Sequence, residues 1–198
     1  NSTERMRLDS SGNLGLGVTP SAWGGTYKAE QLGAKAALSY TSLGNGYTLL
    51  THNGYDSGAG AWKYLATGYA SQYTQVDGTH QWTNAPSGTA GTAITFTTPM
   101  TLTASGQLQL TNDASISGLT VGKGGGAVVT NTTLGYLSLA SNTTGDYSTA
   151  VGRAALYSQT TGSTNDAFGF ATLYALTSGN YNSGFGAGAL GSTTTGSS

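Results

Sequence analysis

The two histidines of this chain are its side chains best suited to acid–base chemistry. His52 and His80 each have an aspartate three or four residues away, Asp56 and Asp77. A histidine held by an aspartate beside a serine can act as a general base. The sequence contains no nucleophile elbow and no strand-to-helix setting for one. Both histidines lie next to expected hairpin turns, so we interpret them as surface or hydrogen-bonded side chains and expect no catalytic residue.

The carboxylates are scattered along the chain. Glycoside hydrolysis needs two carboxyl groups roughly 5–10 Å apart. The eight acidic residues are Glu4, Asp9, Glu30, Asp56, Asp77, Asp113, Asp146 and Asp166. A pair contributed by different subunits would not be visible in one sequence. We predict that the chain is not an enzyme and keep a polysaccharide depolymerase as an alternative.

The segment GLTVGKGGG, residues 118–126, is similar to a phosphate-binding loop but has the wrong spacing. Three residues separate Gly118 from Gly122 where four are needed, and Lys123 is followed by glycine instead of Ser or Thr. We interpret this segment as a flexible joint. Two histidines without paired acids at ligand spacing indicate no metal site, and we expect no cofactor.

Five aromatic residues form a candidate glycan-binding patch. Tyr and Trp rings suit binding surfaces, and rings can stack on the faces of sugars. The five are Trp62, Tyr64, Tyr69, Tyr73 and Trp82. The competing interpretation, which we favour for any single ring, places it in a β-sheet core or a subunit interface.

The composition indicates a folded protein that depends on short strands and many turns. Only 8% of the 198 residues are charged, against about 25% in an average globular protein. The net charge is -1, with 32 glycines, twelve tyrosines, three tryptophans and no cysteine. Near-neutral charge argues against nucleic acid as a partner. No run of 18 apolar residues exists, so we expect no membrane insertion.

A 17-residue repeat occupies the C-terminal part of the chain. Its four copies are 131–147, 148–164, 165–181 and 182–198. Each copy has glycine at positions 5 and 15, leucine at position 9 and a large apolar residue at position 4. Such a period is typical of a solenoid, and two glycines in 17 residues suit one coil of a β-roll with two short strands and two turns. We expect equivalent residues to stack from coil to coil.

The repeat is nearly uncharged, which bears on its assembly. Between residues 124 and 198 the charged residues are Asp146, Arg153 and Asp166. Stacked coils with so neutral a surface and no capping sequence would be prone to aggregate. We therefore expect a homotrimer whose apolar faces turn toward a common axis.

A second internal similarity lies upstream. MRLDSSGNLGL (6–16) matches MTLTASGQLQL (100–110), and both predict a β-hairpin around Ser-Gly. The segment between them holds all three tryptophans and the tight-turn pairs Asn45-Gly46, Asn53-Gly54 and Asp77-Gly78. It predicts an inserted antiparallel β-sandwich, the knob. The expected domains are 1–22 (linker hairpin), 23–99 (knob), 100–130 (second hairpin and joint) and 131–198 (β-roll).

Three stretches resemble tail fibre proteins of tailed bacteriophages. ERMRLDSSGNLGLGVTP (4–20) resembles a linker found repeatedly in such fibres. WKYLATGYASQYTQ (62–75) and THQWTNAPSGTAGTAITF (79–96) are similar to the small β-domain that often follows that linker. The 17-residue repeats resemble fibre shafts and, more loosely, heads of trimeric autotransporter adhesins. Together the similarities cover nearly the whole chain.

The resemblance implies a structural virion component that functions in attachment to the host cell. Its implied partners are two further copies, other tail or baseplate proteins and host surface polysaccharide, and its implied location is the tail fibre of the virion. Many such fibres end in an endosialidase-type intramolecular chaperone, which is absent here. Since the chain begins at Asn1, we expect it to be part of a longer protein. The alternatives are a bacterial trimeric autotransporter adhesin head and a depolymerase tailspike.

Overall fold

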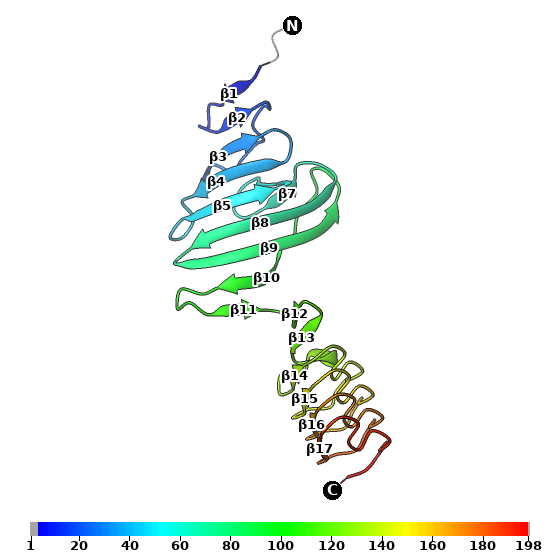
Figure 1. Ribbon diagram of the computed structural model, residues 1–198. Coiled ribbons are helices and arrows are strands. Elements are labelled where there is room, and N and C mark those ends of the chain that lie inside the picture. The colour runs from blue at the N-terminus through cyan, green and yellow to red at the C-terminus, as the bar shows by residue number, and fades with distance from the viewer. Residues whose placement is uncertain (1–3, 198) are drawn as a thin grey trace. The chain divides into compact units, whose positions relative to one another are not determined.

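The computed structural model describes residues 4–197, and its regular structure is almost entirely β (Figure 1). The helical element of this region is a three-residue 3-10 turn, η1 (Gly125–Ala127). No helix in the described range has the length and apolar character needed to cross a membrane. The chain divides into two compact units, Asn1–Thr111 and Asn112–Ser198. The boundary between them falls inside the segment 100–130 that was expected to join the knob to the roll.

The first unit is built on one nine-stranded sheet with the order β1-β2-β3-β4-β5-β8-β9-β10-β11. Its strands are β1 (Met6–Leu8), β2 (Leu14–Leu16), β3 (Tyr27–Leu32), β4 (Ala36–Thr41), β5 (Tyr47–His52), β8 (Gly68–Val76), β9 (Thr79–Gly88), β10 (Thr97–Leu102) and β11 (Leu108–Leu110). Neighbouring strands are antiparallel except β2 and β3. A second sheet pairs β6 (Gly54–Asp56) with β7 (Trp62–Tyr64). The antiparallel strands expected within 23–99 are present, but their sheet continues on both sides into the two hairpins.

The two matching sequence segments form matching hairpins at opposite edges of this sheet. Met6 pairs with Leu16 in the first hairpin, and Met100 pairs with Leu110 in the second. Their turns are closed by equivalent side chains: Asp9 accepts a hydrogen bond from the backbone N of the residue four positions later, and so does Thr103. The two predicted hairpins are therefore present at 6–16 and 100–110.

One face of the central strands β3, β4, β5, β8 and β9 is covered, and the core of the unit lies there, whereas the edge strands β1 and β11 are exposed throughout. The buried apolar side chains form two clusters: Trp23, Tyr27, Ala29, Ala37 and Leu49, and Tyr64, Ala70, Ala85 and Ile94. Trp62 joins them, because its ring lies edge-on to Trp23, Tyr27 and Phe96 at centroid distances of 6.2, 5.8 and 5.7 Å. Edge-to-face contacts of this kind add to the free energy gained by burial.

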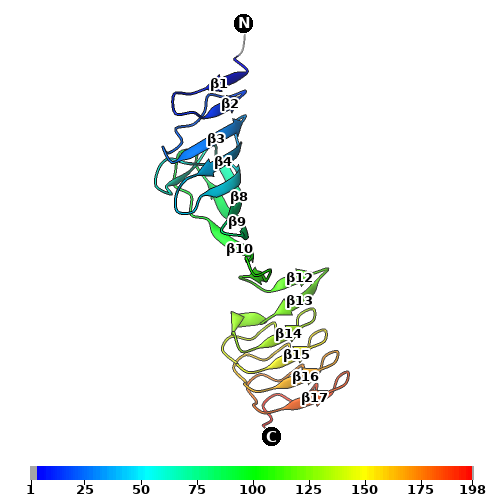
Figure 2. The ribbon, with the colours of Figure 1, turned by 90° about the vertical axis from the view of Figure 1, so that its left-hand side faces the viewer.

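The second unit is a stack of coils on a six-stranded sheet, which Figure 2 shows from the side. Its strands are β12 (Ala114–Ile116), β13 (Leu119–Gly122), β14 (Thr132–Leu134), β15 (Thr149–Val151), β16 (Asp166–Phe168) and β17 (Ser183–Phe185). Strands β14 to β17 are parallel, and each residue pairs with the one 17 positions later. The predicted coil period and the stacking of position 4 are therefore confirmed.

The repeated glycines allow the coils to approach closely. A Cβ on Gly145 would lie 2.1 Å from the backbone oxygen of Gly162, and a Cβ on Gly135 would lie 2.3 Å from that of Gly152. Such distances exclude any side chain. The prediction of two strands per coil is wrong, since each coil has one strand of three residues. The repeated leucines of position 9 adopt φ near +51°, a left-handed conformation that no strand allows.

Candidate interaction surfaces

The uncovered face of the nine-stranded sheet carries an apolar row that crosses every strand. Cross-strand partners place nine side chains in one line: Leu8, Leu14, Glu30, Leu38, Leu50, Tyr73, Trp82, Met100 and Leu110. All are exposed or partly exposed. We call this line the nine-strand row. Its one charged member is Glu30.

Aromatic rings gather at the middle of this row. The rings of Tyr73 and Trp82 lie 5.2 Å apart, and the imidazole of His80 stacks beside Tyr73 with centroids 5.9 Å apart. The Tyr73 hydroxyl and His80 Nδ1 share a short hydrogen bond, and Gln75 Nε2 donates to the same hydroxyl at 3.0 Å. These contacts join Tyr73, His80 and Trp82 into one partly exposed aromatic group.

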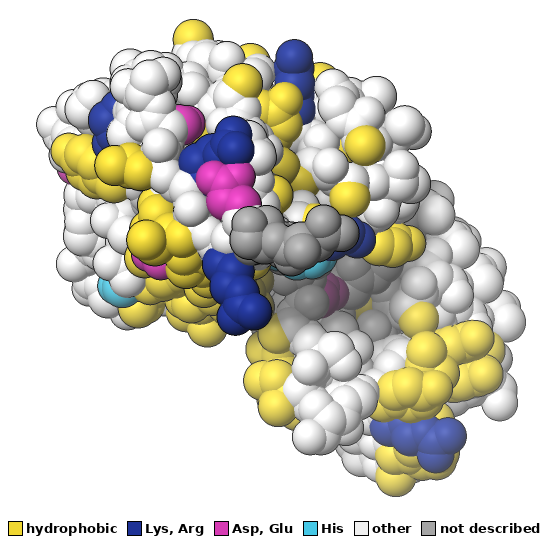
Figure 3. Space-filling model, turned by 90° about the horizontal axis from the view of Figure 1, so that it is seen from above, with side chains coloured by type: hydrophobic (Ala, Val, Ile, Leu, Met, Phe, Trp, Pro, Cys, Tyr) yellow, Lys and Arg dark blue, Asp and Glu magenta, His cyan; other side chains and the backbone are white. Residues whose placement is uncertain are grey.

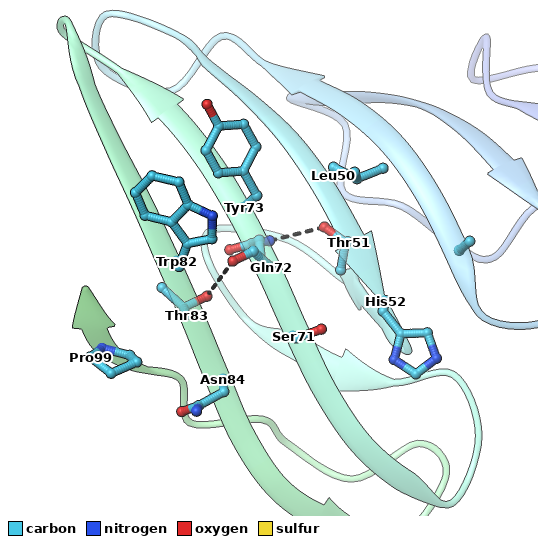
Figure 4. Close-up of a pocket in the computed structure, with 11 residues that line it drawn as sticks. Leu50, Thr51, His52, Ser71, Gln72, Tyr73, Trp82, Thr83, Asn84 and Pro99 are labelled. Atoms are coloured by element: carbon cyan, nitrogen blue, oxygen red, sulfur yellow. Dashed lines mark hydrogen bonds between the residues drawn. The ribbon is translucent and has the colours of Figure 1, made fainter. Parts of the chain in front are cut away.

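A shallow cavity of about 440 Å³ adjoins this aromatic group (Figure 4). Its wall includes Leu50, His52, Ser71, Trp82 and Asn84. In Figure 4 Tyr73 and Leu50 project from neighbouring strands on the same side of the sheet. Apolar rings and a few polar groups together are typical of a surface that binds another molecule.

The structure separates the five candidate glycan-contact residues into two sets. Tyr64 is 4% exposed and its hydroxyl donates to the backbone oxygen of Pro86, while Trp62 is partly buried and packs against the covered core. These two rings therefore offer a glycan less surface than the other three. Tyr69 is 72% exposed, and Tyr73 and Trp82 lie on the uncovered face.

No histidine lies in hydrogen-bond contact with an aspartate in the described part of the chain. His52 belongs to the uncovered face, whereas Asp56 is fully buried on β6, where its Oδ1 accepts from the backbone N of Gly58 at 2.7 Å. Asp77 accepts a hydrogen bond from Asn45 Nδ2 at 2.8 Å, so its carboxylate is paired with an amide and does not orient a histidine.

Asp56 is electrostatically unusual. Its Oδ2 is buried without a hydrogen-bond partner. Burial is the main cause that raises the pKa of this carboxyl group. Burial also raises the pKa of the neighbouring Tyr27 to about 12, and the charge of Asp56 adds to that increase.

The glycine-rich joint already holds an anion of its own. Asp113 accepts hydrogen bonds from the backbone N of Lys123 at 2.8 Å and of Gly124 at 2.7 Å. A carboxylate therefore occupies the amides that a phosphate would need. Within residues 4–197 no group of three or more histidine, aspartate or glutamate side chains is placed to hold a metal ion.

The second unit carries an exposed apolar row of its own, the coil row. Val121, Leu134, Val151, Phe168 and Phe185 are cross-strand partners in turn. The rings of Phe168 and Phe185 stack in parallel at 5.0 Å. Position 4 was expected to be apolar and stacked, but nothing in the sequence showed that it points away from the coil's own core.

Charged side chains are sparse on the face of the molecule that Figure 3 shows, and hydrophobic side chains lie between them.

No protein-family model matches the chain, and no curated protein or solved structure matches it. Any functional conclusion therefore rests on the chemistry of these surfaces.

Proposed function

We propose that the chain is a segment of a homotrimeric tail fibre of a tailed bacteriophage. It is a structural component that positions the host-recognition apparatus and contacts host surface glycans. The fibre class comes from the sequence resemblance. The structural observation that supports a permanent assembly is the nine-strand row, which is apolar at eight of its nine positions and is left uncovered by the described residues of its own unit.

The size of the row favours a permanent partner. Nine strands spaced about 4.8 Å apart span roughly 40 Å. Monomeric proteins rarely leave so long a continuous apolar surface in water, because covering it gains about 25 cal/mol for each Å² of apolar area. A permanent interface of this kind is usually as apolar as a domain core.

Identical copies are the partner that best fits such a row. The row contains Glu30 as its one charged member, and Lys28 lies two residues away on the same face of β3. Symmetric copies can bring these opposite charges together across an interface. In this arrangement the second layer expected of a β-sandwich comes from the sheets of the other subunits.

The coil row gives the same indication in the second unit. Its exposed residues follow one line along the stack, so identical coil stacks can pack side by side around a common axis. Such packing buries the aromatic rings and leaves the turns in water. A stack fastened in this way is suited to a stiff shaft, since coil-to-coil hydrogen bonds and subunit contacts resist bending together.

The solution mass tests this proposal. Light scattering after size exclusion should give roughly 60 kDa, three times the 19.9 kDa chain. A folded species at the mass of one chain would refute the trimeric fibre. Release of reducing ends from capsular polysaccharide by the purified trimer would instead support a depolymerase tailspike.

A further inference from the structure

Arg153 interrupts a pattern that the coils otherwise keep. It occupies position 6 of the repeat, where the other copies carry Tyr136, Phe170 and Ala187. Two aromatic rings and an alanine satisfy this position, so the coil itself does not need a cation there.

The guanidinium of Arg153 lies between two aromatic rings. Its Cζ is 6.0 Å from the centroid of the Tyr136 ring in the preceding coil and 5.8 Å from that of Phe170 in the following coil. Stacking on ring faces restrains the guanidinium plane and leaves its N–H donors available at the edge. The side chain of Arg153 is exposed, and no acidic side chain among residues 4–197 forms an ion pair with it. The one ion pair within residues 4–197 joins Arg7 to Glu4.

A hollow of about 430 Å³ opens beside this guanidinium. Its wall combines backbone at Gly118, Gly135 and Gly152 with the apolar side chains of Leu119 and Leu134. The volume falls in the range of small-ligand sites, and the wall offers an apolar surface next to the guanidinium.

We infer that this hollow binds an acidic sugar residue of a surface polysaccharide, with Arg153 holding the carboxylate. The inference deepens the proposed contact with host glycans and rests on that function. A planar guanidinium pairs with a carboxylate through two parallel hydrogen bonds. A pyranose ring presents a C–H face for the exposed side chain of Leu119. A peptide carboxylate would use the arginine but would not bring a flat C–H face to Leu119.

Calorimetric titration of the complete 198-residue chain tests the inference. The probes are tetragalacturonate and a tetramer of N-acetylneuraminic acid, each compared with its methyl ester, which keeps the sugar and removes the charge. At least one free acid should bind, at least tenfold more tightly than its ester, and binding should weaken as salt rises. Equal binding of acid and ester, or binding of neither acid, would overturn the inference.

Two variants separate recognition from folding. Arg153→Phe keeps an aromatic ladder like that of Tyr136 and Phe170, so the coils should remain folded while acid binding falls at least tenfold. Lys123→Gln removes a cation from the same unit outside the hollow and should change affinity less than twofold. Undiminished binding by Arg153→Phe, or displacement of the sugar by millimolar inorganic phosphate, would contradict a sugar carboxylate on Arg153.

The result of the calorimetric titration is independent of the measurement of solution mass. A trimer that binds neither acid leaves the fibre proposal standing and removes only the Arg153 site. A monomer that binds the free acid would refute the trimeric fibre and leave the Arg153 site standing, because the hollow and both rings belong to one chain.

Discussion

Gln159 Nε2 donates a hydrogen bond of 3.1 Å to Ser148 Oγ, and both side chains are buried inside the coil stack. Ser148 occupies position 1 of its repeat, where the other three copies have asparagine. The asparagines bond to the backbone of their own coil: Asn165 Nδ2 donates to the oxygen of Gly179 at 2.7 Å. In the second coil the shorter serine leaves space that the longer glutamine fills, and Gln159 Oε1 accepts from Asn165 at 3.1 Å.

This pairing predicts strong coupling between positions 148 and 159. Ser148→Asn alone should overpack the space beside Gln159 and lower the free energy of unfolding by about 1–3 kcal/mol. Gln159→Leu alone should cost a similar amount, about 1–3 kcal/mol, because it leaves buried polar groups without partners. The double variant copies the Asn165–Leu176 pair of the next coil. Urea unfolding should show it less destabilised than the sum of the single changes by about 1 kcal/mol or more; simple additivity would contradict the pairing.

The close approach of the coils predicts a sharp difference between two glycines. In Gly162→Ala the new Cβ would lie 2.3 Å from the backbone oxygen of Gly179, so unfolding should be easier by about 2–4 kcal/mol. Gly188→Ala is the control. Position 188 has open space and φ of +69°, and its equivalents Ala154 and Ala171 adopt φ of 57° and 53°. The free energy of unfolding of Gly188→Ala should differ from that of the wild type by less than about 1 kcal/mol. Similar losses in the two variants would show that steric contact is not the reason for the glycine.

Association is expected to depend on the middle of the nine-strand row. Leu50, 56% exposed in one chain, becomes a buried interface residue in the proposed trimer. Leu50→Lys would place a charge without a partner there, at a cost of several kcal/mol per ion. Because the coil row supplies a second contact, light scattering over a dilution series should show Leu50→Lys dissociating at higher protein concentration than the wild type, with an unchanged circular dichroism spectrum. Ser42→Lys, at an exposed loop position, should dissociate as the wild type does; an equally unchanged dissociation of Leu50→Lys would exclude this face from the interface.

The two tryptophans of the proposed glycan patch should behave differently. Trp62→Ala removes a ring from the covered core and should lower the free energy of unfolding by about 3–5 kcal/mol. Trp82→Ala removes a ring from the uncovered face, where the main loss is its contact with Tyr73, about 1 kcal/mol. Both are best measured by urea unfolding in the Leu50→Lys background, at a protein concentration where light scattering reports the mass of one chain. Equal losses would place Trp82 in a core as well.

Asp56 predicts a dependence of stability on pH. Because burial raises the pKa of Asp56 in the folded chain, the folded state holds this proton at pH values where the unfolded state has released it. The contribution of Asp56 to stability is therefore fully present below the pKa that this carboxyl has in the unfolded chain. It is lost as pH rises through the pKa of Asp56 in the folded chain. Asp56→Asn cannot titrate, so its stability should exceed that of the wild type more at pH 7 than at pH 3. A constant difference across that range, measured by urea unfolding, would disprove the effect.

Local and periodic features could be predicted from the sequence. The 17-residue period places equal residues at equal heights, so the stacking of Leu134 on Val151 follows once coils form. The Ser-Gly hairpins could be located because alternating residues and a tight turn lie within eleven positions, 6–16. The turn at Asp77-Gly78 was also predictable, since φ of 50° and 72° suits this pair.

What only the tertiary structure decided is how distant segments pair. The two hairpins were expected to be separate linkers, yet both became edges of one sheet, because backbone pairing extends to any strand that its neighbours bring alongside. The same packing decided which tryptophan lies in the core. Trp62 and Trp82 look alike in sequence, but Trp62 is on β7, which lies over the sheet, and Trp82 is on β9, which lies within it. Alternation shows that a strand has two faces. Which face becomes buried depends on what folds over it, and here that cover, β6 with β7, leaves the nine-strand row in water.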